Sequence, residues 1–216
     1  MSDDLKSAVA KKALSFIEDD MTIGVGSGST VNCLIEALAS IKHRVNGVVA
    51  ASTESEARLK ALGIPVISLT STSQVDLYID GADEINAQKV MIKGGGGALT
   101  REKIISCVAQ KMICIIHQDK YVKRLGKFPI AVEVVPMARS YVARELVKLG
   151  GSPEYREGFI TDNKNIILDV YGFNLSSPIA LEEQLKLITG VVESGLFAKR
   201  TADMILCATS SGIDKY

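Results

Sequence analysis

Short apolar runs alternate with amphipathic segments along the first 120 residues, and this alternation restricts the possible folds more than any other feature. We expect strands at 21–26, 47–52, 65–69, 76–80, 89–93 and 112–117. Helical spacing of apolar residues predicts a helix near the N-terminus and others at about 31–42, from a capping box at Thr53 and Glu56 to Leu62, and at about 99–110. Such alternation predicts βαβ units and a mostly parallel sheet, in which the loops that follow the strands share one edge.

The pattern changes near Lys127. A strand in FPIAVEVVP (128–136) precedes a helix that ends at Gly150 and Gly151, and strands at 155–161 and 165–171 follow, with a turn over 162–165. A helix at about 179–188 and a strand at about 190–197 complete the order β-α-β-β-α-β, which is typical of a ferredoxin-like unit. Since ADMILCAT (202–209) resumes buried-strand character, we expect one domain over 1–127 plus 199–216 and a small α+β domain over 128–198.

The composition excludes several classes of protein. The 216 residues are 47% hydrophobic and 23% charged, so we expect an ordered chain with a core that needs no disulfide or metal. A net charge of zero and the absence of tryptophan argue against nucleic-acid binding. We expect no membrane span and no secretory signal. The four cysteines form no CxxC pair, which predicts buried, reduced thiols in a cytoplasmic protein, and the two histidines lack metal-ligand spacing.

The first of three polar loops that follow strands is GVGSGST (24–30). Its backbone N–H groups, a helix N-terminus and the hydroxyls of Ser27, Ser29 and Thr30 could together bind an anion. The loop fails the dinucleotide fingerprint, because Ser29 replaces a glycine, and it fails the P-loop pattern, because no lysine precedes Ser29 or Thr30. Taken alone, it fits a phosphate site and a tight turn with a helix cap equally well.

The other two loops carry the ionisable groups. DGADEI (80–85) contains Asp80 and Asp83, which fit a surface turn, a site for proton transfer or sugar hydroxyls, or a divalent-metal site. KGGGGALTREK (93–103) begins with Lys93, and its four glycines suit a close approach of backbone to a ligand. Glu102 falls in the first turn of a helix, where an acid also stabilises the helix dipole. Together the loops favour proton transfer on a small phosphorylated, hydroxylated substrate, and no hydride-cofactor motif is present.

Five segments carry a resemblance to a known family: GSGST, DGADEI, KGGGGALTREK, GKFPIAVEVVPMAR and ITGVVESGLFAKR. In their order and spacing they resemble ribose-5-phosphate isomerase, type A, over essentially the whole chain. The resemblance implies a Rossmann-like parallel-sheet α/β domain with a smaller ferredoxin-like α+β domain. It also implies interconversion of D-ribose 5-phosphate and D-ribulose 5-phosphate in the pentose phosphate pathway, with no metal or organic cofactor, in a cytoplasmic homo-oligomer, either a dimer or a tetramer.

The resemblance assigns roles residue by residue. Glu102 matches the general base, and Asp80, Asp83 and Lys93 match further active-site residues. Lys120 matches a substrate contact, and Lys6 is a further candidate for the phosphate, with a solvated helix lysine as the alternative. The remaining matched substrate-binding positions are Ser27, Gly28, Ser29, Thr30, Gly81, Ala82, Gly94, Gly95 and Gly96.

The chemistry of an aldose–ketose isomerase agrees with these roles. One base can move a proton between two neighbouring carbons through an enediolate, and Lys93 can stabilise the oxyanion without a metal. Asp80 or Asp83 can serve the oxygen protons and ring opening. Two other functions stay open: an amino-sugar-phosphate deaminase-isomerase of the same fold, whose motifs differ from KGGGGALTREK, and a sugar-phosphate sensor, which would usually carry a helix-turn-helix.

Overall fold

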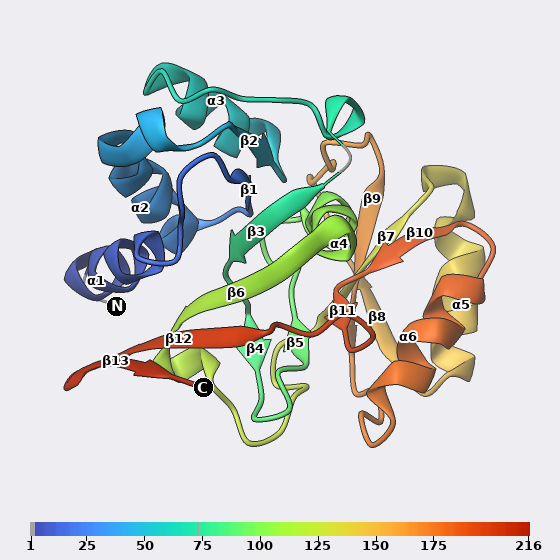
Figure 1. Ribbon diagram of the computed structural model, residues 1–216. Coiled ribbons are helices and arrows are strands. Elements are labelled where there is room, and N and C mark those ends of the chain that lie inside the picture. Colours follow the sequence, from blue (N-terminus) through green and yellow to red (C-terminus); the bar gives the residue numbers. More distant parts are fainter. Residues whose placement is uncertain (1–2, 73) are drawn as a thin grey trace. The chain divides into compact units, whose positions relative to one another are not determined.

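The computed structural model describes residues 3–72 and 74–216, and the chain folds into two compact units (Figure 1). The first unit contains the described residues of 1–82 together with 101–121 and 202–216. The second unit contains 83–100 and 122–201. The first unit contains one sheet and the second contains two, and each unit has its own apolar core.

The first unit is built on a six-stranded sheet. Its strands stand in the order β13-β12-β6-β3-β1-β2, and all neighbours are parallel except β12 and β13. Leaving out β13, the order is that of a doubly wound fold, in which the direction of winding changes between β1 and β3. Ligands of such folds bind at this change of direction, beyond the carboxyl ends of the strands. The strands are β1 (Thr22–Val25), β2 (Gly47–Ala50), β3 (Val75–Asp80), β6 (Ala109–His117), β12 (Met204–Thr209) and β13 (Gly212–Lys215).

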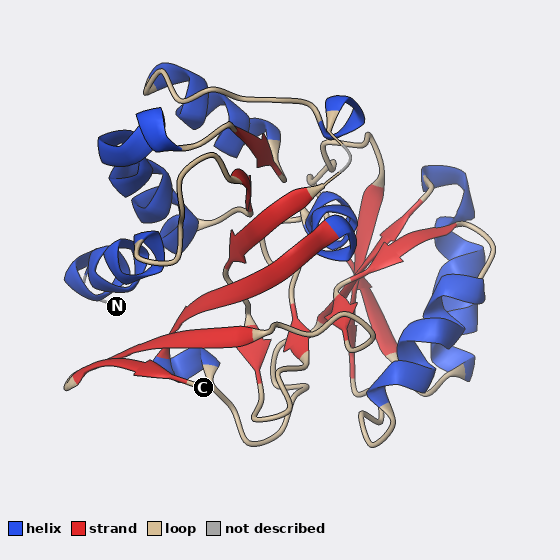
Figure 2. Ribbon diagram, viewed as in Figure 1, coloured by secondary structure: helices blue, strands red, loops and turns tan. Residues whose placement is uncertain are grey.

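Two helices of the first unit, α1 and α2, pack apolar side chains into its core. Val31, Leu34, Ile35 and Leu38 line the buried face of α2, as their spacing predicts, and they share one core cluster with residues of α1 and of the sheet. In Figure 2, α1 and α2 lie side by side. The helices are α1 (Asp3–Leu14), α2 (Ser29–Leu38), η1 (Ala39–Arg44), α3 (Thr53–Ala61), η2 (Leu69–Ser71) and η3 (Gln118–Lys120). A further helix, α4 (Leu99–Val108), begins in the second unit and continues in the first from Arg101.

The second unit has the predicted ferredoxin-like topology. Its antiparallel sheet has the order β10-β7-β9-β8, and both long helices cover the same face of it (Figure 2). Val132 and Leu168 of the sheet pack with Val142 and Leu185 of the helices in one cluster. The elements are β7 (Ile130–Val134), η4 (Pro136–Ala138), α5 (Arg139–Lys148), β8 (Ser152–Tyr155), β9 (Ile166–Tyr171), α6 (Pro178–Leu187) and β10 (Val191–Ser194). The predicted α/β class with a ferredoxin-like portion is confirmed.

A third, small sheet joins distant segments of the second unit. β4 (Glu84–Ile85) and β5 (Met91–Ile92) form an antiparallel pair, and β11 (Leu196–Phe197) pairs with β5. Because of this pairing, residues 83–100 group with 122–201, whereas the domain boundary expected from the sequence placed 83–100 with the larger domain. The boundaries 1–127 plus 199–216 and 128–198 themselves stay a prediction.

Several expected elements are wrong in detail. Residues 65–69 form no strand, because only one isolated bridge, between Val48 and Val66, links this segment to β2. The cap of α3 is Ser52, whose side chain accepts a hydrogen bond from Ser55 N, so Thr53 is not the capping residue. β13 was not expected at all.

In the second unit, two of the predicted strands need correction. The strand expected at 155–161 ends at Tyr155, and 156–165 is a loop. The strand expected at about 190–197 is two strands, because at Gly195 the chain leaves one sheet and enters another. The predicted burial of the cysteines is wrong for Cys107, which is exposed, and for Cys33, which is only half-buried, although all four are free thiols. No helix in the described part of the chain combines the length and apolarity needed to cross a bilayer.

Candidate active site

The loop after β1 lies at the change of winding direction in the first sheet. Gly26 N donates to Ile79 O at 3.0 Å, which fixes the loop against the end of β3. From the other side, the hydroxyl of buried Ser55 donates to Gly26 O at 2.8 Å. Gly28, with φ of 93°, is the N-cap of α2 and lies exposed, as does Ser29. The helix N-terminus and the hydroxyls of this loop are therefore accessible to a ligand, as an anion site requires.

Asp80 ends β3 and is fully buried. Its Oδ1 accepts hydrogen bonds from Ser27 N at 3.2 Å and Gly81 N at 2.7 Å, and its Oδ2 accepts one from the Tyr78 hydroxyl. A side chain at Gly26 would collide with this carboxylate, because an added Cβ would lie 1.8 Å from Oδ1. Asp80 thus ties the loop after β1 to the loop after its own strand.

The Tyr78 phenol is buried beside two acids of the first unit. Burial, and then the charges of Asp80 and Glu102, raise the pKa of Tyr78 well above its ordinary value of 10.0. The phenol therefore stays protonated, and remains a hydrogen-bond donor, over the pH range in which enzymes work.

Glu102 lies in the first turn of α4 and is only 3% exposed. Its Oε1 accepts a hydrogen bond from Ser27 Oγ at 2.6 Å. The close approach of α4 to the sheet depends on Gly24 of β1, where an added Cβ would lie 2.7 Å from Ile105 of the same helix. The fold thereby places a buried carboxylate next to the loop at the change of winding direction, where it could take a proton from a ligand held by that loop.

The second unit holds Asp83, Lys93 and the glycines 94–96 of the predicted site. Gly95 N donates to Asp83 Oδ2 at 2.8 Å, and Asp83 is more exposed than Asp80. Lys93 is 3% exposed, its backbone N donates to Gly195 O at 2.8 Å, and its Nζ lies 5.7 Å from the centre of the Phe197 ring. An added Cβ at Gly195 would lie 2.0 Å from Lys93 O, so the two backbones can approach this closely only because a glycine stands between β10 and β11.

The glycine-rich loop is held by a side chain that the sequence did not single out. Nη1 of Arg156 donates to Gly94 O at 3.0 Å and to Gly95 O at 3.2 Å. The same guanidinium pairs with Asp169 of β9. Gly95 and Gly96 are exposed, whereas Gly94 and Gly97 are buried. The middle of the loop is thus accessible and its ends are anchored.

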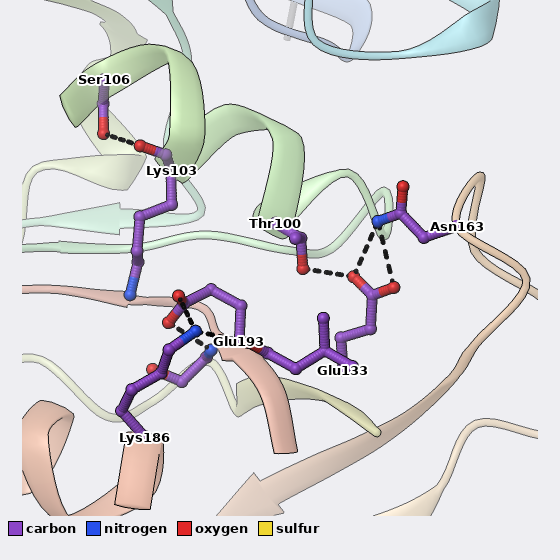
Figure 3. Close-up of polar contacts among 9 residues, drawn as sticks. Thr100, Lys103, Ser106, Glu133, Asn163, Lys186 and Glu193 are labelled. Carbon is purple, nitrogen blue, oxygen red and sulfur yellow. Dashed lines mark hydrogen bonds and ion pairs between the residues drawn. The ribbon is translucent and has the colours of Figure 1, made fainter. Parts of the chain in front are cut away.

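A buried carboxylate anchors the start of α4 within the second unit. Glu133 of β7 accepts a hydrogen bond from the hydroxyl of Thr100, the second residue of α4, and two from Asn163 Nδ2, at 3.1 and 3.4 Å (Figure 3). Thr161 Oγ1 and Asn165 Nδ2 also donate to it, at 2.8 and 2.9 Å. Because these four side chains are all donors, they satisfy the buried charge of Glu133.

The predicted site residues fall into two groups. The first unit brings Ser27, Asp80 and Glu102 together, and the second brings Asp83 and Gly95 together. Lys120 lies half-buried in η3, directly after β6, and Lys6 lies in α1. Sequence reasoning missed four residues that shape the loops: Ser55, Tyr78, Glu133 and Arg156. Two of them had a signal. Tyr78 precedes Asp80 by two residues and so shares its face of the strand, and Glu133 is the charged residue of the apolar run FPIAVEVVP.

No group of three or more His, Cys, Asp or Glu side chains among residues 3–72 and 74–216 is gathered as the ligands of a metal ion would be.

A family model and curated relatives match most of the chain. Residues 47–212 match the family model described as ribose 5-phosphate isomerase A (phosphoriboisomerase A). A ribose-5-phosphate isomerase A from Legionella pneumophila (strain Lens) is 62% identical over 211 residues, 98% of each chain.

Two solved structures extend the agreement to the fold. Ribose 5 phosphate isomerase A from Neisseria gonorrhoeae has a TM-score of 0.97 at 45% identity, covering 100% of this chain and 96% of that one. A D-ribose-5-phosphate isomerase in complex with phospho-erythronic acid has a TM-score of 0.94 at 36% identity, covering 99% and 97%. The chain belongs to the ribose 5-phosphate isomerase A family.

Proposed function

We propose that this chain interconverts D-ribose 5-phosphate and D-ribulose 5-phosphate in the non-oxidative branch of the pentose phosphate pathway. Family membership over nearly the whole chain supports the activity. The observation that carries the mechanism is the buried Glu102 carboxylate. It accepts a hydrogen bond, 2.6 Å long, from the hydroxyl of Ser27 in the loop that precedes α2.

Glu102 is the proposed general base. Its carboxylate removes the proton from carbon 2 of the open aldose, and the electron pair of that C–H bond forms the C1=C2 double bond of an enediolate with negative charge on O1. Glu102 then returns the proton to carbon 1, while the proton of O2 leaves and O1 is protonated. The N-terminal dipole of α4 favours the ionised carboxylate that this first step needs.

The other motif residues are proposed to act on the oxygens. Lys93 stabilises the enediolate charge. Asp83 exchanges protons with the sugar oxygens and assists ring opening, because it is the more exposed of the two aspartates. Asp80 organises the loop after β1, since both of its oxygens accept bonds from the first unit. The backbone at Gly94, Gly95 and Gly96, of which Gly95 and Gly96 are exposed, contacts the sugar together with Gly81 and Ala82.

The phosphate is proposed to bind at the loop Ser27–Thr30 and the N-terminus of α2. Lys120, and Lys6 as a further candidate, would add positive charge. Phosphate binding then supplies remote binding energy that orients the reacting carbons.

An assay with ribose 5-phosphate and with free ribose, before and after exhaustive chelation, tests these proposals. We expect turnover of ribose 5-phosphate that survives chelation, very poor turnover of ribose, and competitive inhibition by phospho-erythronic acid, whose carboxylate resembles the enediolate. Equal turnover of the two sugars would contradict the phosphate site. Loss of activity on chelation, with recovery on adding magnesium or manganese, would contradict the metal-free mechanism.

We also propose a homo-oligomer, most simply a dimer, in the cytoplasm. Exposed apolar side chains in the second unit support association, notably Met137 at 95% and Leu187 at 83% exposure. Four free thiols suit a reducing compartment. Sedimentation equilibrium of the full chain tests the assembly, and a monomer at micromolar concentration would contradict it.

A further inference from the structure

Arg156 contacts the glycine-rich loop but belongs to none of the motifs that the mechanism uses. Its Nη1 donates to the carbonyl oxygens of Gly94 and Gly95, at 3.0 and 3.2 Å. We infer that Arg156 is a positioning residue, which holds the loop 94–97 in the conformation that receives the substrate. The inference rests on the proposed role of this loop in substrate binding.

The guanidinium of Arg156 is itself fixed on two sides. Nε and Nη2 donate to the two carboxylate oxygens of Asp169, at 2.8 and 2.5 Å, and Asp169 lies in β9 of the four-stranded sheet. The guanidinium lies over the Phe159 ring, with 5.4 Å between Cζ and the ring centre. Both charged side chains are only 17% exposed. A planar fork held in this way presents Nη1 to the loop in one direction, which a lysine could not do.

The same segment also closes the far end of the loop. Gly97 has φ of 78° and packs so closely on Phe159 that an added Cβ would lie 2.2 Å from the ring. At the middle of the loop, Gly95 N donates to Asp83 Oδ2. Arg156 therefore holds two carbonyl groups of the loop, Phe159 packs against its last glycine, and Asp83 holds one of its N–H groups.

The consequence for binding follows from the entropy of glycine. Four consecutive glycines have more conformational freedom than any other tetrapeptide, so a loop released from Arg156 would populate many conformations. The substrate would then have to select the competent ones, and its apparent affinity would fall by the fraction that they occupy. Once bound, the substrate would reorder the loop, so the loss should appear in KM much more than in kcat.

Three variants of the full-length enzyme test this. Arg156→Gln removes the charge and the fork, Arg156→Lys keeps the charge alone, and Val142→Ala is a matched control that opens a cavity in the core of the same unit without contacting the loop. For each, steady-state kinetics with ribose 5-phosphate, the melting temperature and hydrogen exchange of the amides of 94–98 are measured.

We expect Arg156→Gln to raise KM by about tenfold or more, to change kcat by less than about threefold, and to speed exchange at 94–98. For Arg156→Lys, both KM and the exchange rate at 94–98 should lie between the values of Arg156→Gln and of the wild type. Val142→Ala should lower the melting temperature and leave KM and loop exchange unchanged. If Arg156→Gln does not fold, Arg156→Lys carries the same comparison with the control.

Two outcomes would overturn the inference. One is a lowered melting temperature with wild-type KM, which is the behaviour of a merely structural ion pair. The other is faster exchange at 94–98 without any rise in KM. Failure of the proposed function is distinguishable from both, because the wild-type enzyme would then show no turnover of ribose 5-phosphate, while the exchange data would still report on the loop.

Discussion

Two glycines of the first unit, Gly26 and Gly81, show at the scale of single residues how tightly the site is packed. Both flank the Asp80 carboxylate, yet their surroundings differ. An added Cβ at Gly26 would lie 1.8 Å from Asp80 Oδ1, whereas one at Gly81 would have only the Ile115 carbonyl oxygen near it, at 3.7 Å. The first position has no room for a methyl group and the second has.

Gly26→Ala should therefore destabilise the enzyme by about 1–3 kcal/mol or more, since neither the backbone nor the bonded carboxylate can move freely. Gly81→Ala is the matched control and should unfold at nearly the wild-type urea concentration. Urea unfolding of both variants checks the prediction, and equal stabilities would show that Asp80 can leave its hydrogen bonds without cost.

Glu102→Gln distinguishes between two roles of this residue, the proposed general base and an acid that only stabilises the helix terminus. The change keeps the shape and removes the proton acceptor, so kcat should fall by about 10²–10⁴ while KM changes little. A helix-stabilising acid would instead give a slightly lower melting temperature with kcat nearly intact. Measuring kcat, KM and melting temperature together distinguishes the two, and a near-normal kcat would make Asp80 or Asp83 the next candidate.

At the scale of elements, the sequence predicted most helices and strands because each buries a periodic apolar face. The prediction from sequence failed where tertiary contacts determine the backbone conformation. Residues 65–69 look like a strand but make a single bridge, and 155–161 look like a strand although Arg156 and Thr161 turn toward Asp169 and Glu133. Those partners lie far along the chain, so no local pattern could reveal them.

A variant of Glu133 tests how strongly the stability of the 156–165 loop and of the start of α4 depends on one buried charge. Glu133→Gln places an amide among four donor side chains and leaves at least one of them unsatisfied, so the free energy of unfolding should fall by about 1–3 kcal/mol. Glu154→Gln, at an exposed position of β8, is the control and should have little effect. If both variants unfold alike, the network does not stabilise the unit.

At the scale of the whole molecule, the chain passes from one unit to the other inside the motifs themselves. The boundaries at 82/83 and 100/101 fall within DGADEI and within KGGGGALTREK. Family resemblance could assign roles to these residues without any structure. It could not supply Tyr78, Ser55 or Arg156, because their effect depends on contacts rather than on a sequence motif.

The raised pKa of the Tyr78 phenol makes the stability of the folded chain depend on pH. Burial and the neighbouring Asp80 and Glu102 raise its pKa well above 10.0, so the folded state holds this proton more tightly than the unfolded state does. The stabilisation is complete below pH 10 and is lost as pH rises from there through the folded pKa. In that range the free energy of unfolding should fall by up to about 1.4 kcal/mol per pH unit from this group alone.

Tyr78→Phe removes the group. Below pH 10 the variant should be less stable than the wild type by about 1–3 kcal/mol, because Asp80 loses a donor. Above pH 10 the difference should shrink as the wild type loses its advantage. Cys207 and Tyr216, whose pKa values are also raised, are present in both proteins and cancel in the comparison. Urea unfolding of both proteins from pH 8 to 11 measures the difference, and parallel curves across that range would mean that the phenol is no more strongly protonated in the folded enzyme than in the unfolded chain.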